Sequence, residues 1–441
     1  MNARRPLPPR AAALGAGVFL MVLLAAPAGA EPARALAPAE ALGKRIFFDA
    51  GLSRNRNQSC ATCHSPATGF TGPDSPVNAG GAAYEGSIAG RFGNRKPPSA
   101  AYATPSPVLH ARVEDGERIY VGGNFWDGRA TGERLGSAAA EQAQGPFLNP
   151  VEQALPDAAC VVQRVCAADY GADFRALHPK ACEIAFPKGL DEACAKGRAA
   201  KLAPAARKQV QASYDRIALA IAAYEHSPEV NAYSSKFDAV RAGRASFTPQ
   251  EALGLDLFKG KGKCADCHPA DPGPGGEPPL FTDNTFDNLG VPRNPANPWY
   301  RQPKLNPAGA KWVDEGLGAF LRTRADLKRD AAGNLGKQRV PTLRNVDQRP
   351  DASFVKAYMH NGWFKSLESV VHFYNTRDAK PRCPKPLTTE EEALKVGCWP
   401  APETMANLNR EELGDLKLTK AEEEAIVAFM RTLTDGYAPG K

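Results

Sequence analysis

The pattern of apolar and polar positions predicts helices joined by long loops. Apolar residues recur at helical spacing from Ala205 to about Arg241 and from Ser366 to Tyr374. Thr419 and Glu422 have the spacing of a capping box, and a further amphipathic helix follows them. Residues 271–309 are rich in Gly, Pro and Asn, which is typical of a loop. Because we find no run that alternates apolar and polar residues as strands do, the predicted fold is mainly α.

Two parts of the chain resemble each other. The sequence PAEALG at residues 38–43 is matched by PQEALG at residues 249–254. Each begins a short amphipathic helix, which leads into a loop and then into the pattern C-x-x-C-H. A repeat on this scale favours two similar domains in tandem.

The two C-x-x-C-H motifs are the attachment signature of c-type haem. Two thiols on one helical turn can each form a thioether with the porphyrin edge, and the next residue then places an imidazole under the iron. We therefore predict two covalent haems, with His64 and His268 as proximal iron ligands and four attachment cysteines: Cys60, Cys63, Cys264 and Cys267. The alternative is a redox-active dithiol or disulfide, which does not explain two motifs after matching helices.

The first thirty residues predict export. Arg4, Arg5 and Arg10 precede an apolar run over 11–26, and small residues follow as far as Ala30. This order describes a secretory signal peptide, and the run is shorter than the ~20 residues that a membrane span needs. Since this type of haem attachment is normally completed after export, we expect a periplasmic protein.

Charge and the remaining cysteines refine the picture. The formal net charge of +7 falls by three, to +4, if the signal segment with its three arginines is removed. So small and scattered a charge argues against nucleic-acid binding. In an exported protein we expect the other cysteines to form disulfides, with a zinc site as the alternative. We group the first four within one insert and pair the last two: Cys160, Cys166, Cys182, Cys194, Cys383 and Cys398.

A series of short motifs is similar to the bacterial di-haem cytochrome c peroxidase/MauG superfamily. Besides the haem motifs, the matching segments are Leu52-Ser53, FWDGRA at 125–130, EQA at 141–143, GP at 145–146, NPVE at 149–152, PTLRN at 341–345, YMHNG at 358–362 and SLE at 366–368. Each alone is weak, but their order and number identify the chain as a member of the superfamily. The resemblance implies two cytochrome c-like haem domains in tandem, joined by long irregular loops, and a reaction with hydrogen peroxide at the first haem.

The resemblance also implies roles around the first haem. Glu152 matches a glutamate that moves a proton between the two peroxide oxygens, which heterolysis of the O–O bond requires. Gln142 matches a glutamine that hydrogen-bonds in the same pocket. Trp126 matches a tryptophan that carries electrons between the haems, and an indole suits this because it is large and oxidisable. Outside these motifs, the three residues would be interpreted as solvated or core positions.

The sixth ligand of the second haem separates branches of the superfamily. Other peroxidases place a methionine eight residues after the serine of the Ser-Leu segment, and counting from Ser366 reaches Tyr374. Tyrosinate is a hard anionic ligand that stabilises oxidised iron. The resemblance thus favours the MauG/BthA-like branch, with His268 and Tyr374 on the second iron. His372 and Met359 remain alternatives.

The first haem also departs from the commoner pattern. Other members have a second histidine that blocks the resting iron, but residues 65–109 contain none. We therefore expect an open first iron that reacts with peroxide without prior reduction. His110 is the nearest candidate blocker, and we interpret its surroundings as a packing segment.

These features suggest domain boundaries. We expect a signal peptide over 1–30, an N-terminal haem domain over 31–205 with a cysteine-rich insert at 157–196, a linking helix region over 206–245 and a C-terminal haem domain over 246–441. The resemblance implies a calcium ion between the domains, but the chain departs from the usual pattern at 93–97, so the ion is left unassigned. The oligomeric state is open, a homodimer included.

The predicted activity is the oxidation of an external donor at the expense of hydrogen peroxide. The donor is a small redox protein or a residue of a partner protein, and we expect neither nucleic acid nor stable membrane insertion. The alternative is a non-enzymatic di-haem electron carrier, in which each iron has two strong ligands.

Overall fold

The computed structural model describes residues 34–114 and 116–439, and the predicted signal peptide lies outside these residues. The described chain is mainly helical, which confirms the predicted fold class. Long loops and short 3-10 turns join the helices.

The first half of the chain builds one hydrophobic core, drawn from residues Leu42 to Val230. Its helices are α1 (Pro38–Phe48), α2 (Ser75–Ala79), α3 (Ala138–Leu148), α4 (Ala158–Ala167), α5 (Gly171–Leu177), α6 (Leu190–Ala195) and α7 (Pro204–His226).

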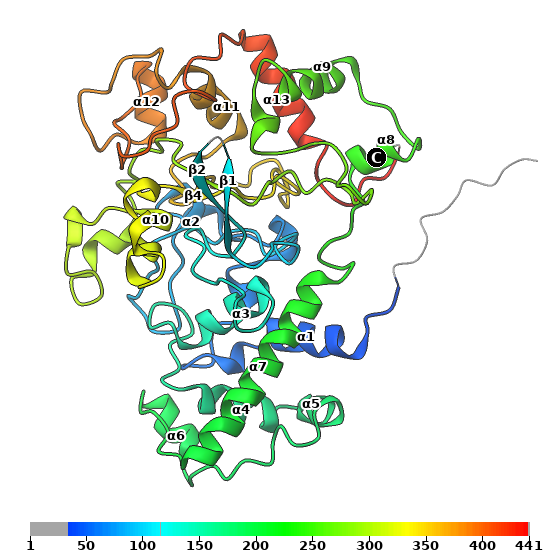
Figure 1. Cartoon of the computed structure of the whole chain (residues 1–441), viewed down its shortest axis with the longest axis vertical. Helices are drawn as coiled ribbons and strands as arrows, with labels where there is room; N and C mark the ends of the chain where they lie inside the picture. Colours follow the sequence, from blue (N-terminus) through cyan, green and yellow to red (C-terminus); the bar gives the residue numbers. More distant parts are fainter. Residues whose placement is uncertain (1–33, 115, 440–441) are drawn as a thin grey trace, which may run out of the picture. The chain divides into compact units, whose positions relative to one another are not determined.

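The second half builds another core, drawn from residues Phe237 to Leu433. Its helices are α8 (Lys236–Arg241), α9 (Pro249–Lys259), α10 (Gly316–Thr323), α11 (Leu367–Thr376), α12 (Glu390–Val396) and α13 (Lys420–Arg431). Figure 1 shows α9, α11 and α13 grouped together, apart from α1, α4 and α7.

A glycine at the same place in each repeat lets two helices cross closely. A methyl group added to Gly43 of α1 would lie 1.8 Å from the carbonyl oxygen of Ala220 in α7. A methyl group added to Gly254 of α9 would lie 2.0 Å from the carbonyl oxygen of Ala425 in α13. Any side chain here would push the helices apart, so the repeated Leu-Gly marks the same helix crossing in both halves. Each haem motif follows one of these crossings.

The helix predicted from Ala205 to Arg241 is wrong in its extent. The chain leaves the helix at His226, where α7 ends, and α8 begins only at Lys236. Pro228 explains the break, because its ring disfavours helical backbone at Ser227. The helix predicted after Thr419 is confirmed as α13, including its capping box.

A β-hairpin was not predicted and stands between the two halves. Strands β1 (His110–Glu114) and β2 (Glu117–Val121) are antiparallel, with His110 paired to Val121. The residues of β1 are almost all exposed, so the strand has no alternation of apolar and polar positions. The other pair is β3 (Phe286–Asp287) with β4 (Gln338–Arg339). A small third core packs the hairpin against β3 and α10 through Leu109, Tyr120, Phe286, Leu317 and Leu321.

Disulfides cross-link the cysteine-rich insert. Cys160–Cys194 joins α4 to α6, and Cys166–Cys182 joins α4 to the loop after α5. A third bond, Cys383–Cys398, lies in the second half. The predicted grouping is therefore confirmed, and the zinc alternative is wrong.

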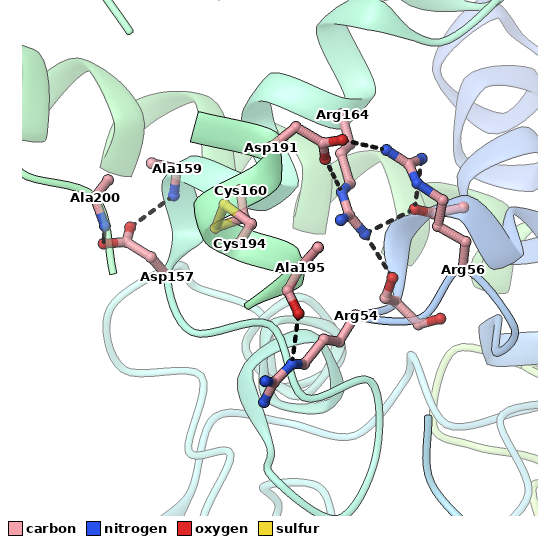
Figure 2. Close-up of a disulfide and its surroundings, with 12 residues drawn as sticks. Arg54, Arg56, Asp157, Ala159, Cys160, Arg164, Asp191, Cys194, Ala195 and Ala200 are labelled. Atoms are coloured by element: carbon pink, nitrogen blue, oxygen red, sulfur yellow. Dashed lines mark hydrogen bonds and ion pairs between the residues drawn. A yellow bond between two sulfur atoms is a disulfide. The ribbon is translucent and has the colours of Figure 1, made fainter. Parts of the chain in front are cut away.

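Arg164 ties the insert to the segment that leads to the first haem motif (Figure 2). Its buried side chain donates to Asp191 at 2.9 Å and to the carbonyl oxygens of Gly51 and Ser53 at 3.1 and 2.5 Å. Arg56 also donates to Asp191, at 2.8 Å. The insert thus braces residues 51–56, just before Cys60.

Candidate functional site

Each haem motif opens into a cavity. The first motif lines a cavity of about 1440 Å³ and the second lines one of about 1470 Å³. These volumes include space that is open to solvent. In each case both cysteines and the histidine of the motif line the same cavity, as the covalent attachment of a haem requires. We call them the first and the second cavity.

Both motif histidines are oriented as metal ligands require. His64 Nδ1 lies 3.0 Å from the carbonyl oxygen of Phe70, and His268 Nδ1 lies 2.7 Å from that of Phe281. A proton on Nδ1 that is donated to the carbonyl leaves the Nε2 lone pair free for iron. Burial lowers the pKa of both imidazoles, to about 4 for His268, which keeps them neutral.

The remaining groups also fit haem. Among the described residues, the four motif cysteines are the free thiols, while the other six cysteines are bridged. Lys96 and Arg339 line both cavities, and burial lowers their pKa values to about 8 and about 10. Arg339 Nε is buried without a hydrogen-bond partner among the described residues. Buried cations of this kind suit the carboxylate groups that a haem carries.

Two polar side chains from α3 and the turn after it face the first cavity. Gln142 lies within α3, and Glu152 lies beyond Pro150. The Glu152 carboxylate accepts a hydrogen bond from Asn149 Nδ2 at 2.8 Å. Burial raises the pKa of Glu152, while the charge of Arg129 opposes this rise. The structure therefore brings Gln142, Glu152 and His64 to one cavity.

Tyr374 lines the second cavity together with His268. It lies in the last turns of α11, whose N-cap is Ser366. Burial holds the pKa of the phenol well above its usual value, so a strong nearby positive charge is needed to remove its proton.

The rival histidines lie elsewhere. His372 Nδ1 pairs with Glu423 at 3.0 Å, and the residue does not line the second cavity. His110 is exposed at the start of β1, with Nδ1 2.9 Å from the carbonyl oxygen of Val108, and it does not line the first cavity. The adjoining Leu109 packs in the third core, in agreement with the predicted packing segment. Met359 does line the second cavity and remains an alternative ligand.

Trp126 belongs to the wall that the two cavities share. Its Nε1 donates to the carbonyl oxygen of Lys96 at 2.9 Å, and its own carbonyl accepts from the backbone N–H of Arg339 at 2.8 Å. The indole is thus fixed between the cavities by the same two residues that supply the buried cations.

Three residues of the cavities escape sequence reasoning. Glu225 lies on the buried side of α7 and lines the first cavity, where burial raises its pKa to about 8. The one indication of this in the sequence is that Glu225 follows the apolar Ile221 by four positions, which places both on the same face of a helix. Lys96 and Arg339 carry no signal, because loop residues of this type are usually solvated.

The positive charge on the wall between the cavities is unfavourable for a calcium ion. Lys96 and Arg339 place positive charge on this wall. Among the described residues, one cluster of His, Cys, Asp or Glu side chains is close enough together to hold a metal ion. It consists of Cys267, Asp287 and Glu412, and it contains a haem-motif cysteine. A calcium ion prefers several oxygen ligands without cations beside them.

Two adjoining cavities with a C-x-x-C-H motif each define a di-haem cytochrome of the c type. The di-haem cytochrome c peroxidase family model matches residues 37–246. Methylamine utilization protein MauG of Paracoccus denitrificans is 35% identical over 423 residues, which cover 94% of each chain. Cytochrome c551 peroxidase of Nitrosomonas europaea is 26% identical over 96% of this chain and 88% of that protein. The solved structure of the diheme peroxidase BthA from Burkholderia thailandensis matches with a TM-score of 0.68 and 29% identity, covering 91% of this chain and 87% of that one.

The chain therefore belongs to the di-haem cytochrome c peroxidase/MauG family. It is a di-haem peroxidase that carries two c-type haems, and the alternative of a non-enzymatic electron carrier is not supported. Between residues 34 and 439, residue 115 aside, no helix has the length and apolar character for crossing a membrane.

Proposed function

We propose that this enzyme reduces hydrogen peroxide in the first cavity and oxidises an external donor by way of the second. One observation carries this division. Among the described residues that line the first cavity, His64 is the sole imidazole and no methionine is present, whereas Glu152 and Gln142 face the same space. The phenol of Tyr84 also lines this cavity, but its hydroxyl is hydrogen-bonded to the Asp74 backbone and to Asn78. The second cavity offers Tyr374, Met359 and His360 beside His268. One site is thus built to admit a substrate and the other to saturate its iron.

The chain's own residues have separate tasks in this proposal. Cys60, Cys63 and His64 would hold the first haem, and Cys264, Cys267 and His268, together with Tyr374, would hold the second. Each haem supplies an iron that accepts and releases electrons.

Glu152 takes a proton from one peroxide oxygen and delivers it to the other, which then leaves as water. Gln142 orients the peroxide by hydrogen bonding. Trp126 passes electrons one at a time between the two sites.

We further propose that the enzyme works in the periplasm on a small redox protein or on a residue of a partner protein. The three disulfides support an oxidising compartment. The name of the MauG relative refers to methylamine utilization, and the relative from Nitrosomonas europaea is named as a peroxidase. Both kinds of donor lie outside the protein, so electrons must reach its surface in either case.

Electron paramagnetic resonance (EPR) of the purified ferric protein tests the division between the sites. We expect one high-spin and one low-spin haem, and the high-spin signal should disappear when one equivalent of peroxide is added without a reductant. Two low-spin signals that ignore peroxide would refute the proposal. Reaction of the half-reduced form alone would show that the first iron is blocked in the resting enzyme.

A further inference from the structure

A line of side chains runs from Trp126 along the wall of the second cavity, through His360 and Glu403, and leaves that cavity at Arg293. The rings of Trp126 and His360 lie 6.4 Å apart, edge to face. His360 Nε2 lies 4.0 Å from Glu403 Oε2, and Glu403 Oε1 lies 3.9 Å from Arg293 Nε. These three side chains are largely buried.

The gaps in this line suit ordered water. His360 Nε2, Glu403 Oε2 and Arg293 Nε are buried without hydrogen-bond partners among the described residues. Buried polar atoms in native proteins are normally satisfied, and bridging water does this where side chains stand about 4 Å apart. Water bound between these atoms would connect His360 to Arg293 through Glu403.

Arg293 leads to three aromatic side chains in the segment 298–312. Its guanidinium lies 4.2 Å from the ring centre of Tyr300, and it donates to the carbonyl oxygen of Trp312 at 2.5 Å. The rings of Tyr300 and Trp312 are 6.2 Å apart, and those of Trp312 and Trp299 are 6.1 Å apart. We call Trp299, Tyr300 and Trp312 the aromatic triplet.

The two tryptophans of the aromatic triplet are more exposed than the other tryptophans of the chain. The chain has five tryptophans, and Trp126, Trp363 and Trp399 are buried. Trp299, Tyr300 and Trp312 are half-buried, and the neighbouring Val313 is 39% exposed. An indole near the surface that is also connected to Trp126 can exchange electrons with a docked partner.

We propose that the aromatic triplet is the port through which the external donor delivers electrons, and that Trp312 is its redox-active member. This rests on the proposed function, because it identifies the route from the donor, along the wall of the second cavity, to Trp126. The indole of Trp312 gives one electron inward toward Trp126 and regains one from the donor, with no bond made or broken. Two such electrons and two protons from solvent convert one hydrogen peroxide into two water molecules.

The charge around the port indicates the kind of donor. Arg301, Lys304 and Lys311 are exposed within this segment, and no ion pair joins them to an acidic group of the described chain. An unpaired basic rim around an aromatic patch attracts an acidic partner and speeds its association. We therefore expect a negatively charged one-electron donor protein, such as an acidic cupredoxin.

Chemical mapping of the oxidised holoenzyme tests the port without measuring turnover. With excess peroxide and no donor, oxidation should accumulate on the tryptophans of the port, and peptide mass spectrometry should find oxygen added to Trp312 and Trp299. Trp363 and Trp399 serve as internal controls and should stay unmodified. Oxidation confined to haem-cavity residues, with an intact Trp312, would overturn the proposal.

Donor kinetics give a second measurement. Trp312→Phe should leave the absorption change with peroxide intact but slow the oxidation of a reduced acidic cupredoxin at least several-fold, whereas Phe186→Leu, a half-buried aromatic in the insert, should change neither. Lys304→Glu with Lys311→Glu should slow association by about tenfold at low salt and weaken its salt dependence. Lys201→Glu, an exposed site in the first half, is the charge control.

The two proposals fail in different ways. If the wild-type protein does not react with peroxide, the proposed function fails. If Trp312→Phe reacts with peroxide and still oxidises the cupredoxin at the wild-type rate, the port fails and the proposed function stands.

Discussion

Two carboxyl groups line the first cavity, and their surroundings make them different acids. Burial raises the pKa of both, but Arg129 and the Asn149 amide oppose the rise at Glu152. Glu225 has no such compensation, and its pKa of about 8 keeps it protonated at neutral pH. Glu152 is therefore the carboxylate available to accept a proton from peroxide, and Glu225 is a neutral acid in the same wall.

Glu152→Gln should slow the reaction with peroxide by about 10²–10⁴-fold, the usual contribution of a general base. In the wild-type enzyme the rate should fall as pH falls through the raised pKa of Glu152, because protonation removes the base; the variant should lack this fall. Stopped-flow absorption across pH measures both effects. Glu225→Gln is the matched control: it mimics the protonated acid, so a loss as large as that of Glu152→Gln would contradict this assignment.

Tyr374 is the residue on which the assignment of the second haem depends. Tyr374→Phe removes the phenolate oxygen, so the low-spin EPR signal of this haem should change while the high-spin signal of the first haem stays. His372→Gln should leave both signals unchanged, because His372 is paired with Glu423 outside the cavity. An unaltered low-spin signal in Tyr374→Phe would leave Met359 as the ligand to test next.

For single residues, the sequence predicts those whose position is fixed by the spacing of a motif. The haem motifs and Tyr374 stand at defined distances from other signals, and the structure brings each of them to a cavity lined by a motif histidine. Lys96, Arg339 and Glu225 have no such spacing. Their importance comes from burial, which depends on how distant loops meet and is therefore invisible in one sequence.

The helices show a similar division. The repeated PAEALG and PQEALG segments predict α1 and α9, because both the periodicity and the close helix crossing at the glycine are local requirements. The end of α7 is also encoded locally, by Pro228, although the apolar periodicity continues beyond it. The β1–β2 hairpin was not predictable, because its strands are stabilised by pairing with each other and by a small core shared with α10.

The insert gives a prediction about elements. Replacing Cys160 and Cys194 with alanine should lower the free energy of unfolding by about 2–4 kcal/mol, since the bond closes a loop over a sequence separation of 34 residues. The loss should also disturb the first haem, because Arg164 braces residues 51–56 from the same insert. Urea unfolding, followed by haem absorption, measures both.

The matched control is Cys383→Ala with Cys398→Ala, which opens a loop with a separation of 15 residues. Its loss should be smaller, because a shorter loop restricts the unfolded chain less. This disulfide lies beside Trp399, whose Nε1 donates to Thr376 at the end of α11, so any spectral change should concern the second haem. Equal effects of the two pairs on the first haem would show that the insert has no special role there.

For the whole molecule, the shared wall decides how the two sites communicate. Trp126 is held by the backbone of Lys96 and Arg339, and the ammonium of Lys96 lies 5.9 Å from the indole ring. A positive charge at this distance disfavours a further positive charge on the indole. Trp126 should therefore transmit electrons without storing an oxidising equivalent, which would then reside at the two haem sites.

Trp126→Phe tests this coupling, because phenylalanine keeps an aromatic ring in the wall but is much harder to oxidise than an indole. The first haem should react with peroxide at the wild-type rate, since Glu152 and Gln142 are untouched, whereas the spectral change of the second haem should lag behind it. In the wild-type enzyme the two changes should coincide. Trp363→Phe, in the second core and away from both cavities, controls for the loss of an indole. If both haems of Trp126→Phe changed together, electrons would have to cross the wall by another path, with the neighbouring Pro341 and Arg339 backbone as the first candidates.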